Sequence, residues 1–314
     1  MRIVITGPTG AIGMALIKKC IDEKISVLAI CHKGSERLAN MPQSAYLDVF
    51  EADLSDLKNI EKKDVGLSED DRFDIFYHFA WAGTTGQARN NMPLQISNIQ
   101  YTMDAVELAK RLGCTCFVGA GSQAEYGRVE GRLSADTPAF PENGYGMAKL
   151  CAGEMSRVRC EELGIRHIWT RILSVYGPYD GKGSMIMSTI LKLSESKRAS
   201  LTAGGQKWDY LYSEDAAQAM LLLGKNGIGG RTYVIGSGNA RPLKEYIEML
   251  NESVRLQNGS TGELGFGDIP YGEKQVMHLE ADISLLKADT GFEPQTDFAE
   301  GIRKTVEHLL TDRH

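Results

Sequence analysis

Residues 145–149 read YGMAK, which places a phenol and an amine four residues apart. On a helix this spacing brings the side chains of Tyr145 and Lys149 to one face. A free tyrosine has a pKa near 10, about three units too high for a base at neutral pH, and a neighbouring ammonium lowers it. The pair could therefore move a proton in catalysis. The same spacing also occurs where the ring packs in a core and the amine is solvated, so the rest of the chain has to distinguish the two.

A glycine-rich turn near the N-terminus suggests a dinucleotide site. The apolar run at 3–6 leads into TGPTGAIG, with Gly7, Gly10 and Gly13 three residues apart, followed by a helical pattern. Glycines at such a turn permit a tight bend, close approach of a pyrophosphate and close packing of helix on strand. The helix N-terminus then offers free N–H groups to the phosphates. We expect dinucleotide binding here, with a merely tight turn as the alternative.

The segment AICHKGSERL at the end of the second strand bears on the choice of cofactor. Cys31 stands where an acid would bind the adenosine ribose of NAD, and His32, Lys33 and Arg37 follow it. Because cations suit a 2′-phosphate, the segment predicts NADP, with NAD as the alternative cofactor and a solvated basic loop as the alternative structure. Asp53 is placed either to accept from the adenine amino group or to cap a helix.

The pattern of elements predicts an α/β fold with a doubly wound parallel sheet of the Rossmann type. Strands are expected at 3–6, 26–31, 46–51, 75–80, 115–120 and 166–173, and helices at 12–23, 96–112 and 146–162. Later helices are expected at 184–193, 214–223, 243–254, 282–289 and 297–310, with a strand at 232–235. We expect a dinucleotide-binding domain at 1–175 plus about 206–240, and a smaller interleaved substrate-binding domain at about 176–205 and 241–314.

Composition excludes several partner classes. The 314-residue chain has a net charge of −6, which offers no basic surface for nucleic acid or an anionic membrane. No apolar run approaches the ~20 residues of a membrane span, and the N-terminus lacks a signal-peptide layout, so we expect a cytoplasmic protein. The six cysteines are expected to be free buried thiols, with Cys114 and Cys116 on one face of a strand, and no metal site is predicted; a metal or redox site is the alternative.

Several motifs together resemble one family along essentially the whole chain. They are TGPTGAIG, the S-x-x-x-Y-G of 122–127 at the end of the fifth strand, YGMAK, the VYGP of 175–178, GGQKWDYLYSED at 204–215 and ADISLLKADTGFEP at 281–294. In this order they resemble the extended short-chain dehydrogenase/reductases, which are nucleotide-sugar epimerases, dehydratases and reductases. The resemblance implies that Tyr145 exchanges a proton with a sugar oxygen. It also implies that Lys149 supplies charge and binds the nicotinamide ribose, and that Ser122 binds the substrate oxygen.

The resemblance also implies a wider set of contacts and an oligomeric state. The cofactor set comprises Gly7, Thr9, Gly10, Ala11, Ile12, Gly13, His32, Lys33, Arg37, Asp53, Leu54, Ala80, Trp81, Ala82, Asn98, Tyr145, Lys149, Leu173 and Val175. The substrate set comprises Thr84, Ser122, Gln123, Ser174, Trp208 and Tyr210, with Lys182 and Arg89 as further possible contacts. Helices 96–112 and 146–162 are expected to form a homodimer by packing against those of a second copy.

Departures from the family pattern narrow the chemistry. Dehydratases of the family carry an Asp-Glu pair after the catalytic Ser or Thr, whereas this chain has Gln123 and Ala124. Glu125 comes one place late and is expected to face away, so dehydration is not expected. Ala124 also replaces the Cys of the GDP-fucose epimerase-reductase, which argues against 3,5-epimerisation.

Two further departures lie on the nucleotide side. Ser174 and Trp208 stand where many UDP-sugar enzymes have Asn and a phosphate-binding Arg, which weakens a specific assignment to UDP-sugars. The indole of Trp208 could stack on a base or sugar, or pack as core.

Three functions follow in order. The first is an NADP(H)-dependent reductase of a nucleotide-linked 4-keto-6-deoxy sugar, in which hydride transfer is coupled to a Tyr/Lys/Ser proton relay. The alternative is an NAD(P)-dependent nucleotide-sugar 4-epimerase similar to UDP-glucose 4-epimerase. A cofactor-binding redox sensor is a third reading, which the retained Tyr145 and Lys149 disfavour.

Overall fold

The computed structural model describes residues 1–311, and a seven-stranded parallel sheet forms its centre. In spatial order the strands are β12 (Thr232–Ile235), β7 (Arg166–Ile172), β5 (Cys116–Ser122), β4 (Ile75–His78), β1 (Arg2–Thr6), β2 (Ser26–Cys31) and β3 (Leu47–Glu51). The chain builds outward from β1 to β3, then returns to β4 and builds the other way. The predicted doubly wound sheet is therefore confirmed, and its topological switch lies between β1 and β4, where such sheets bind ligands.

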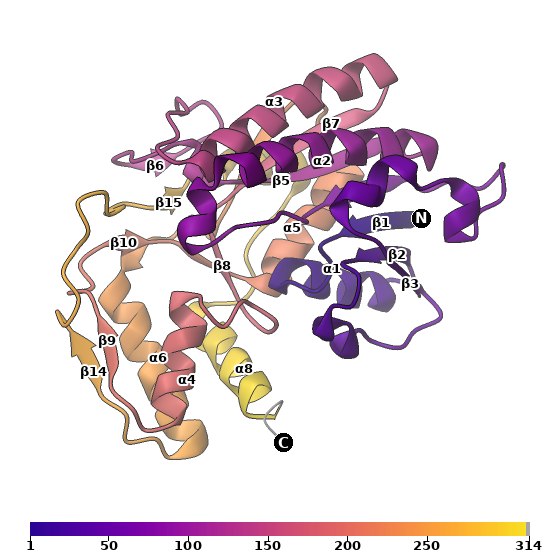
Figure 1. Ribbon diagram of the computed structural model, residues 1–314. Coiled ribbons are helices and arrows are strands. Elements are labelled where there is room, and N and C mark those ends of the chain that lie inside the picture. The colour runs from indigo at the N-terminus through magenta and orange to yellow at the C-terminus, as the bar shows by residue number, and fades with distance from the viewer. Residues whose placement is uncertain (312–314) are drawn as a thin grey trace.

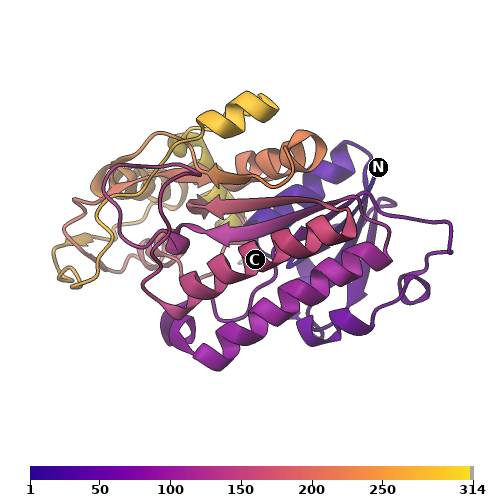
Figure 2. The ribbon, with the colours of Figure 1, turned by 90° about the horizontal axis from the view of Figure 1, so that it is seen from above.

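Helices cover both faces of this sheet (Figure 2). The helices α1 (Ala11–Asp22) and α5 (Ser213–Asn226) pack on one face, and α2 (Met92–Arg111) and α3 (Gly144–Leu163) lie side by side on the other. Alternation within β1 serves both layers: Ile3 and Ile5 enter the α1/α5 core, whereas Val4 enters the α2 core. Apolar side chains on both faces explain why these strands read as continuous apolar runs.

Local signals set the helix boundaries more precisely than periodicity did. The helix α2 begins at Met92, before the predicted residue 96, because the Asn91 side chain accepts from the Leu94 N–H and Pro93 stands in the first turn. The helix α3 begins at Gly144, capped by Asn143 through the Gly146 N–H, and ends at Gly164 in the left-handed conformation. One detail of the prediction was wrong: Cys114 lies before β5, so it does not share a strand face with Cys116, although both are buried.

The second half of the chain adds smaller elements beside the carboxyl ends of the sheet (Figure 1). They are β6 (Arg132–Leu133), β8 (Ser174–Tyr176), α4 (Met185–Ser194), β9 (Ala199–Leu201), β10 (Lys207–Trp208), β11 (Tyr210–Tyr212), β13 (Arg241–Pro242), α6 (Leu243–Asn258), β14 (Leu264–Phe266), β15 (Glu280–Ala281), α7 (Ser284–Thr290) and α8 (Phe298–Thr311). Segments distant in sequence pair here, for example β15 with β6 and β14 with β9. The predicted division into two interleaved domains stays a prediction.

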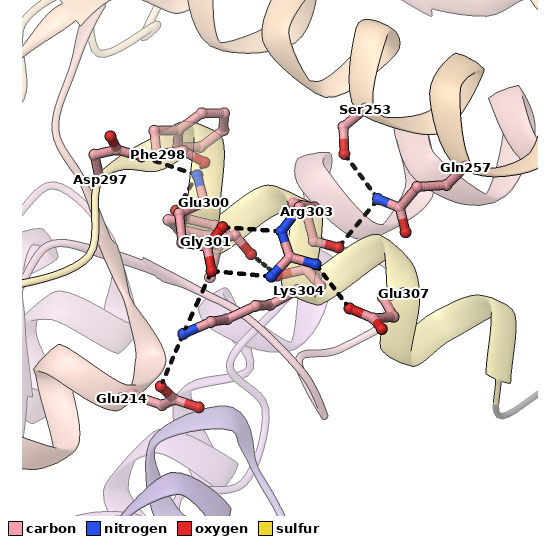
Figure 3. A network of polar contacts seen from close by, with 12 residues as sticks. Glu214, Ser253, Gln257, Asp297, Phe298, Glu300, Gly301, Arg303, Lys304 and Glu307 are labelled. Carbon is pink, nitrogen blue, oxygen red and sulfur yellow. Dashed lines mark hydrogen bonds and ion pairs between the residues drawn. The ribbon is translucent and has the colours of Figure 1, made fainter.

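The helix α8 joins this second half to the sheet. Figure 3 shows Lys304 reaching Glu214 on α5 (3.6 Å), while Arg303 pairs with Glu300 and Glu307 along α8 itself. These ion pairs are exposed, and each contributes about 0–1 kcal/mol. Apolar packing carries more: the ring centroid of Phe298 lies 4.8 Å from that of Tyr176.

No helix among residues 1–311 is both long enough and apolar enough to cross a membrane.

The indole of Trp169, on β7, sets the distance between α3 and the sheet. A Cβ added at Gly153 on α3 would lie 2.7 Å from the Trp169 ring, and one added at Gly119 on β5 would lie 2.3 Å from it. The ring thus fills space that these glycines leave open. Because α3 carries YGMAK in its first two turns, this packing also fixes the height of Tyr145 and Lys149 above the sheet.

We expect Gly153→Ala to destabilise the protein by about 1–3 kcal/mol, because the added methyl overpacks against the buried Trp169 ring. Urea unfolding followed by circular dichroism measures the change. Gly181→Ala is the matched control, since a Cβ there meets no atom within 4 Å and its φ is not left-handed. Equal stability of the two variants would show that Trp169 does not limit the approach of α3.

Candidate active site

The glycine turn has the geometry that a pyrophosphate requires. Gly7 adopts φ +69°, and a Cβ there would lie 2.7 Å from the Ala80 backbone nitrogen. A Cβ at Gly13 would lie 2.7 Å from the Gly7 carbonyl oxygen, so α1 packs directly on the turn. The N-terminus of α1 starts at Gly10 without any side-chain cap, which leaves its first N–H groups for a ligand.

Two cavities open on either side of this turn. One of about 280 Å³ is lined by Gly7, Gly10, Ala11, Ile12, Gly13, Phe79, Trp81, Thr84, Ala120, Gly121, Ser122, Tyr145, Lys149, Ile172, Leu173, Val175 and Asp180. The other, of about 330 Å³, is lined by Thr6, Gly7, Pro8, Thr9, Ile30, His32, Ala52, Leu54, Leu57, Ala80, Trp81 and Ala82. Together they place a mostly apolar pocket on one side of the phosphate-binding turn and the YGMAK pair on the other. This fits a dinucleotide with its adenosine in the second cavity and its nicotinamide in the first.

The cations expected to bind a 2′-phosphate are engaged by carboxylates or by the backbone. His32 Nδ1 lies 2.7 Å from Asp53 Oδ1, and Lys33 Nζ lies 2.7 Å from Asp56 Oδ2. Arg37 reaches back to the Thr9 carbonyl oxygen at 3.4 Å. Asp53 also begins a 3-10 helix at 54–59, so the capping alternative describes it in this structure. Of this group, His32 lines the second cavity, whereas the other three do not line either cavity.

Ser122 and the YGMAK pair meet at the mouth of the first cavity. Ser122 ends β5, and Tyr145 and Lys149 lie in the first two turns of α3; all three side chains are buried. Burial raises the pKa of Tyr145, while a hydrogen bond with the Ser122 side chain and the charge of Arg89 oppose that rise. Within the described cavity the three predicted catalytic side chains are therefore brought together.

Lys149 is held by different partners from those the spacing suggested. Its Nζ donates to the Ala120 carbonyl oxygen and lies 3.7 Å from the centroid of the Trp81 ring, but 5.9 Å from that of Tyr145. Burial lowers the pKa of Lys149 to about 7. The four-residue spacing thus places both groups on the cavity, yet the amine points along the sheet toward Ala120.

The loop that follows β4 is fixed by two side chains on α2. Asn98 Oδ1 accepts from the Ala82 N–H (2.9 Å) and its Nδ2 donates to the Ala82 carbonyl (2.8 Å), while Gln95 Oε1 accepts from the Trp81 indole N–H. The amide of Asn98, predicted to contact the cofactor, is thus engaged in holding the backbone that lines both cavities. Sequence reasoning did not anticipate Gln95, which is buried and has no motif of its own.

Glu125 turns inward beneath the end of β5. It is fully buried, and its carboxylate accepts from the Ser122 N–H (2.7 Å), the Trp169 indole N–H (3.1 Å) and Arg171 Nε (2.9 Å). Burial raises its pKa, against the influence of Arg171 and these hydrogen bonds. Glu125 does not line the described cavities, so the expectation that it faces away from substrate agrees with the structure; it points into the core and not to solvent.

The predicted substrate residues fall into two places. Thr84 and Ser122 line the first cavity, and Gln123 lines an adjoining cavity of about 230 Å³ that also contains Arg89, Arg128 and Lys274.

The remaining predicted substrate residues lie at 174–210. The Trp208 indole N–H donates to Ser174 Oγ (2.7 Å), and the Tyr210 ring packs edge-on against Tyr176 and Tyr246. Their substrate contacts remain predictions. Asp180, which sequence reasoning missed, lines the first cavity two residues after the VYGP motif.

Comparison with known proteins places this geometry in a family. The sequence profile described as "NAD dependent epimerase/dehydratase family" matches residues 3–236. The chain belongs to the NAD-dependent epimerase/dehydratase family. Membership makes it an enzyme of this type and agrees with the resemblance found from its motifs.

Its relatives in this family divide between two chemistries. The chain is 25% identical to an uncharacterized UDP-glucose epimerase of Bacillus subtilis, with 98% of each chain covered. It is also 25% identical to the dTDP-glucose 4,6-dehydratase of Salmonella typhimurium, covering 99% of this chain and 93% of the relative. The Thermus thermophilus UDP-glucose 4-epimerase, solved in complex with NAD, has the same fold: TM-score 0.84, 21% identity, 99% of each chain covered.

We expect the stability of the cofactor-free protein to depend on pH through Lys149. Its pKa is about 7 when folded and near 10.5 when unfolded, so the unfolded chain binds more protons across that interval. The free energy of unfolding should therefore gain a contribution that rises with pH from 7 to 10.5 and is absent below 7.

Urea unfolding at several pH values, compared with Lys149→Met, isolates this contribution. The difference between wild type and variant should grow with pH. Lys63→Met, at an exposed lysine, is the control and should run parallel to wild type. Parallel curves for Lys149→Met as well would contradict the low pKa of Lys149.

Proposed function

We propose that the protein is an NADP(H)-dependent reductase of a nucleotide-linked 4-keto-6-deoxy sugar. The observation that carries the proposal is the protonation state of Tyr145. Burial raises its pKa above the usual value near 10, so at neutral pH the phenol holds its proton in a cavity shared with Ser122. A buried phenol of this kind is a proton donor, as the reduction of a carbonyl requires.

The residues divide the work of that reduction. Ser122 Oγ donates a hydrogen bond to the substrate carbonyl oxygen, and Tyr145 gives its proton to the same oxygen as it becomes an alkoxide. The bound cofactor supplies the hydride to the carbonyl carbon. Lys149, beside Trp81 in the same cavity, binds the nicotinamide ribose and stabilises charge when it is protonated.

The lack of dehydratase acids supports reduction over dehydration. Gln123 and Ala124 follow Ser122, and the carboxylate of Glu125 is consumed by the Ser122 N–H, Trp169 and Arg171. No acid from this segment can therefore deliver a proton to a departing hydroxyl. A reductase of this kind depends on a separate dehydration reaction to make its keto-sugar.

A second candidate is a nucleotide-sugar 4-epimerase that retains NAD. Acids crowd the segment after β2: Glu51 Oε2 accepts from the Gly34 N–H (2.9 Å), and Asp53 and Asp56 pair with His32 and Lys33. Carboxylates at this place suit the ribose hydroxyls of NAD, whereas exposed cations that exchange partners suit the 2′-phosphate of NADP. The epimerases among the similar proteins favour this candidate, and the raised pKa of Tyr145 favours the reductase.

We expect the purified protein to oxidise NADPH when supplied with nucleotide-linked 4-keto-6-deoxy sugars, and at least tenfold faster than it oxidises NADH. Absorbance at 340 nm across a panel of such sugars measures both rates. Tyr145→Phe should lower kcat by about 10²–10⁴-fold because the proton donor is lost.

Tyr46→Phe, at a tyrosine that does not line the two cavities, should keep wild-type rates. The reductase would be excluded if the protein carried stoichiometric NAD and interconverted C4 epimers without added cofactor.

We further propose that the protein forms a homodimer through the outer faces of α2 and α3. These faces expose an apolar stripe in the absence of a partner, made up of Met92, Ile96, Met147, Met155 and Val158. Met147, Met155 and Val158 recur at helical spacing on α3, and the half-buried Cys151 lies between them. An apolar stripe of this kind marks an association surface.

We expect Ile96→Glu combined with Met155→Glu to give a folded monomer, because each charge would be buried in the proposed interface. Light scattering coupled to gel filtration, at micromolar concentration, measures the mass. Leu256→Glu is the control: Leu256 is 72% exposed on α6, away from the stripe, and the variant should remain dimeric. A monomeric wild type, or a dimeric double variant, would contradict this interface.

A further inference from the structure

The catalytic tyrosine has a second cation as a direct neighbour. The guanidinium carbon of Arg89 lies 4.4 Å from the centroid of the Tyr145 ring. Arg89 belongs to a 3-10 helix, η4 (Gly86–Asn90), in the loop between β4 and α2. The chain therefore brings a charge from outside the YGMAK motif onto the reactive ring.

Several contacts hold Arg89 in this position. One of its amino groups (Nη1) donates to the Thr84 carbonyl oxygen at 3.3 Å, and Thr84 itself lines the first cavity. The neighbouring Asn90 accepts from the Gly144 N–H at 3.0 Å, so η4 is tied to the first turn of α3 beside Tyr145. There is also no room for a side chain at Gly144, where a Cβ would lie 3.0 Å from the Arg89 carbonyl oxygen.

Lys149 is a weaker source of charge for the same ring. Its Nζ is 5.9 Å from the Tyr145 centroid and is engaged by the Ala120 carbonyl and the Trp81 ring. Its pKa of about 7 leaves only part of the population charged at neutral pH. A guanidinium, in contrast, stays charged at every accessible pH.

We propose that Arg89 is a positioning residue for proton transfer: its guanidinium packs on the ring of Tyr145 and stabilises the phenolate that remains when the proton has left. The proposal rests on the proposed function only in that Tyr145 moves the proton. A cation over an aromatic face is attracted by the neutral ring and more strongly by the anion. Arg89 therefore fixes the phenol before the transfer and offsets the cost of its charge afterwards.

The other groups that face Tyr145 divide into those that favour the phenolate and those that oppose it. Ser122 on β5 hydrogen-bonds to it, and Lys149 on α3 adds charge when protonated. Glu125, beneath β5, raises the pKa of Tyr145, and the Trp81 ring meets Tyr145 edge-on. The charge of Arg89 lowers the pKa of Tyr145 and so opposes both Glu125 and the burial of the phenol.

Direct titration of Tyr145 tests the proposal. Tyrosine labelled with ¹³C at Cζ is incorporated, the Tyr145 resonance is assigned by its loss in Tyr145→Phe, and its shift is followed from pH 7 to 11. Arg89→Gln should raise the pKa of Tyr145 by roughly half a unit to one unit, which lowers the ionised fraction about three- to tenfold at a given pH. Arg89→Lys should recover part of this effect.

Arg128→Gln is the matched control, because Arg128 lines the adjoining cavity but pairs with Glu142 at 2.7 Å. It should leave the Tyr145 titration unchanged. The proposal is overturned if Arg89→Gln titrates like wild type, or if only Lys149→Met raises the pKa of Tyr145. Circular dichroism verifies the fold of each variant, and Arg89→Lys serves as the test if Arg89→Gln does not fold.

The titration needs no sugar substrate. A titration independent of Arg89 would therefore leave the reductase proposal standing. Conversely, a protein that fails to reduce keto-sugars but shows the Arg89-dependent titration would overturn the proposed function alone.

Discussion

The buried carboxylate of Glu125 is the contact on which the site depends most. It joins the Ser122 N–H, the Trp169 indole and Arg171, and so connects the end of β5 to β7. Removing one partner of such a buried ion pair costs about 3–5 kcal/mol, because the other charge stays buried without compensation. The position of Ser122 over the cavity is thus set by the same contact that holds two central strands together beneath it.

A second constraint comes from close packing at glycines. Gly7 lets the phosphate-binding turn touch the backbone of Ala80 after β4, and Gly153 lets α3 settle on Trp169. The first brings the cofactor turn to the topological switch between β1 and β4, and the second brings Tyr145 to the same edge from the opposite side of the sheet. Dinucleotide turn and proton donor meet because both approaches leave no space for a side chain.

Much of the fold was predictable because its signals are local. Apolar runs bounded by turns gave the seven strands of the sheet, and YGMAK and TGPTGAIG gave the two halves of the cavity. Boundaries were less accurate: α2 begins four residues before its predicted start, because a single cap at Asn91 and Pro93 overrides apolar periodicity. The short strands of the second half were missed, since pairs such as β6 with β15 join segments far apart in sequence.

The sequence by itself determined the parallel sheet, the dinucleotide turn and the identity of the Ser122, Tyr145 and Lys149 set, because residue type and spacing specify each of these locally. Only the tertiary structure decided the electrostatics around that set. Lys149 is turned toward Ala120, Glu125 is locked under β5, and Arg89 arrives on the Tyr145 ring from a separate loop. Charge depends on burial and on neighbours across the fold, and neither can be read from a motif.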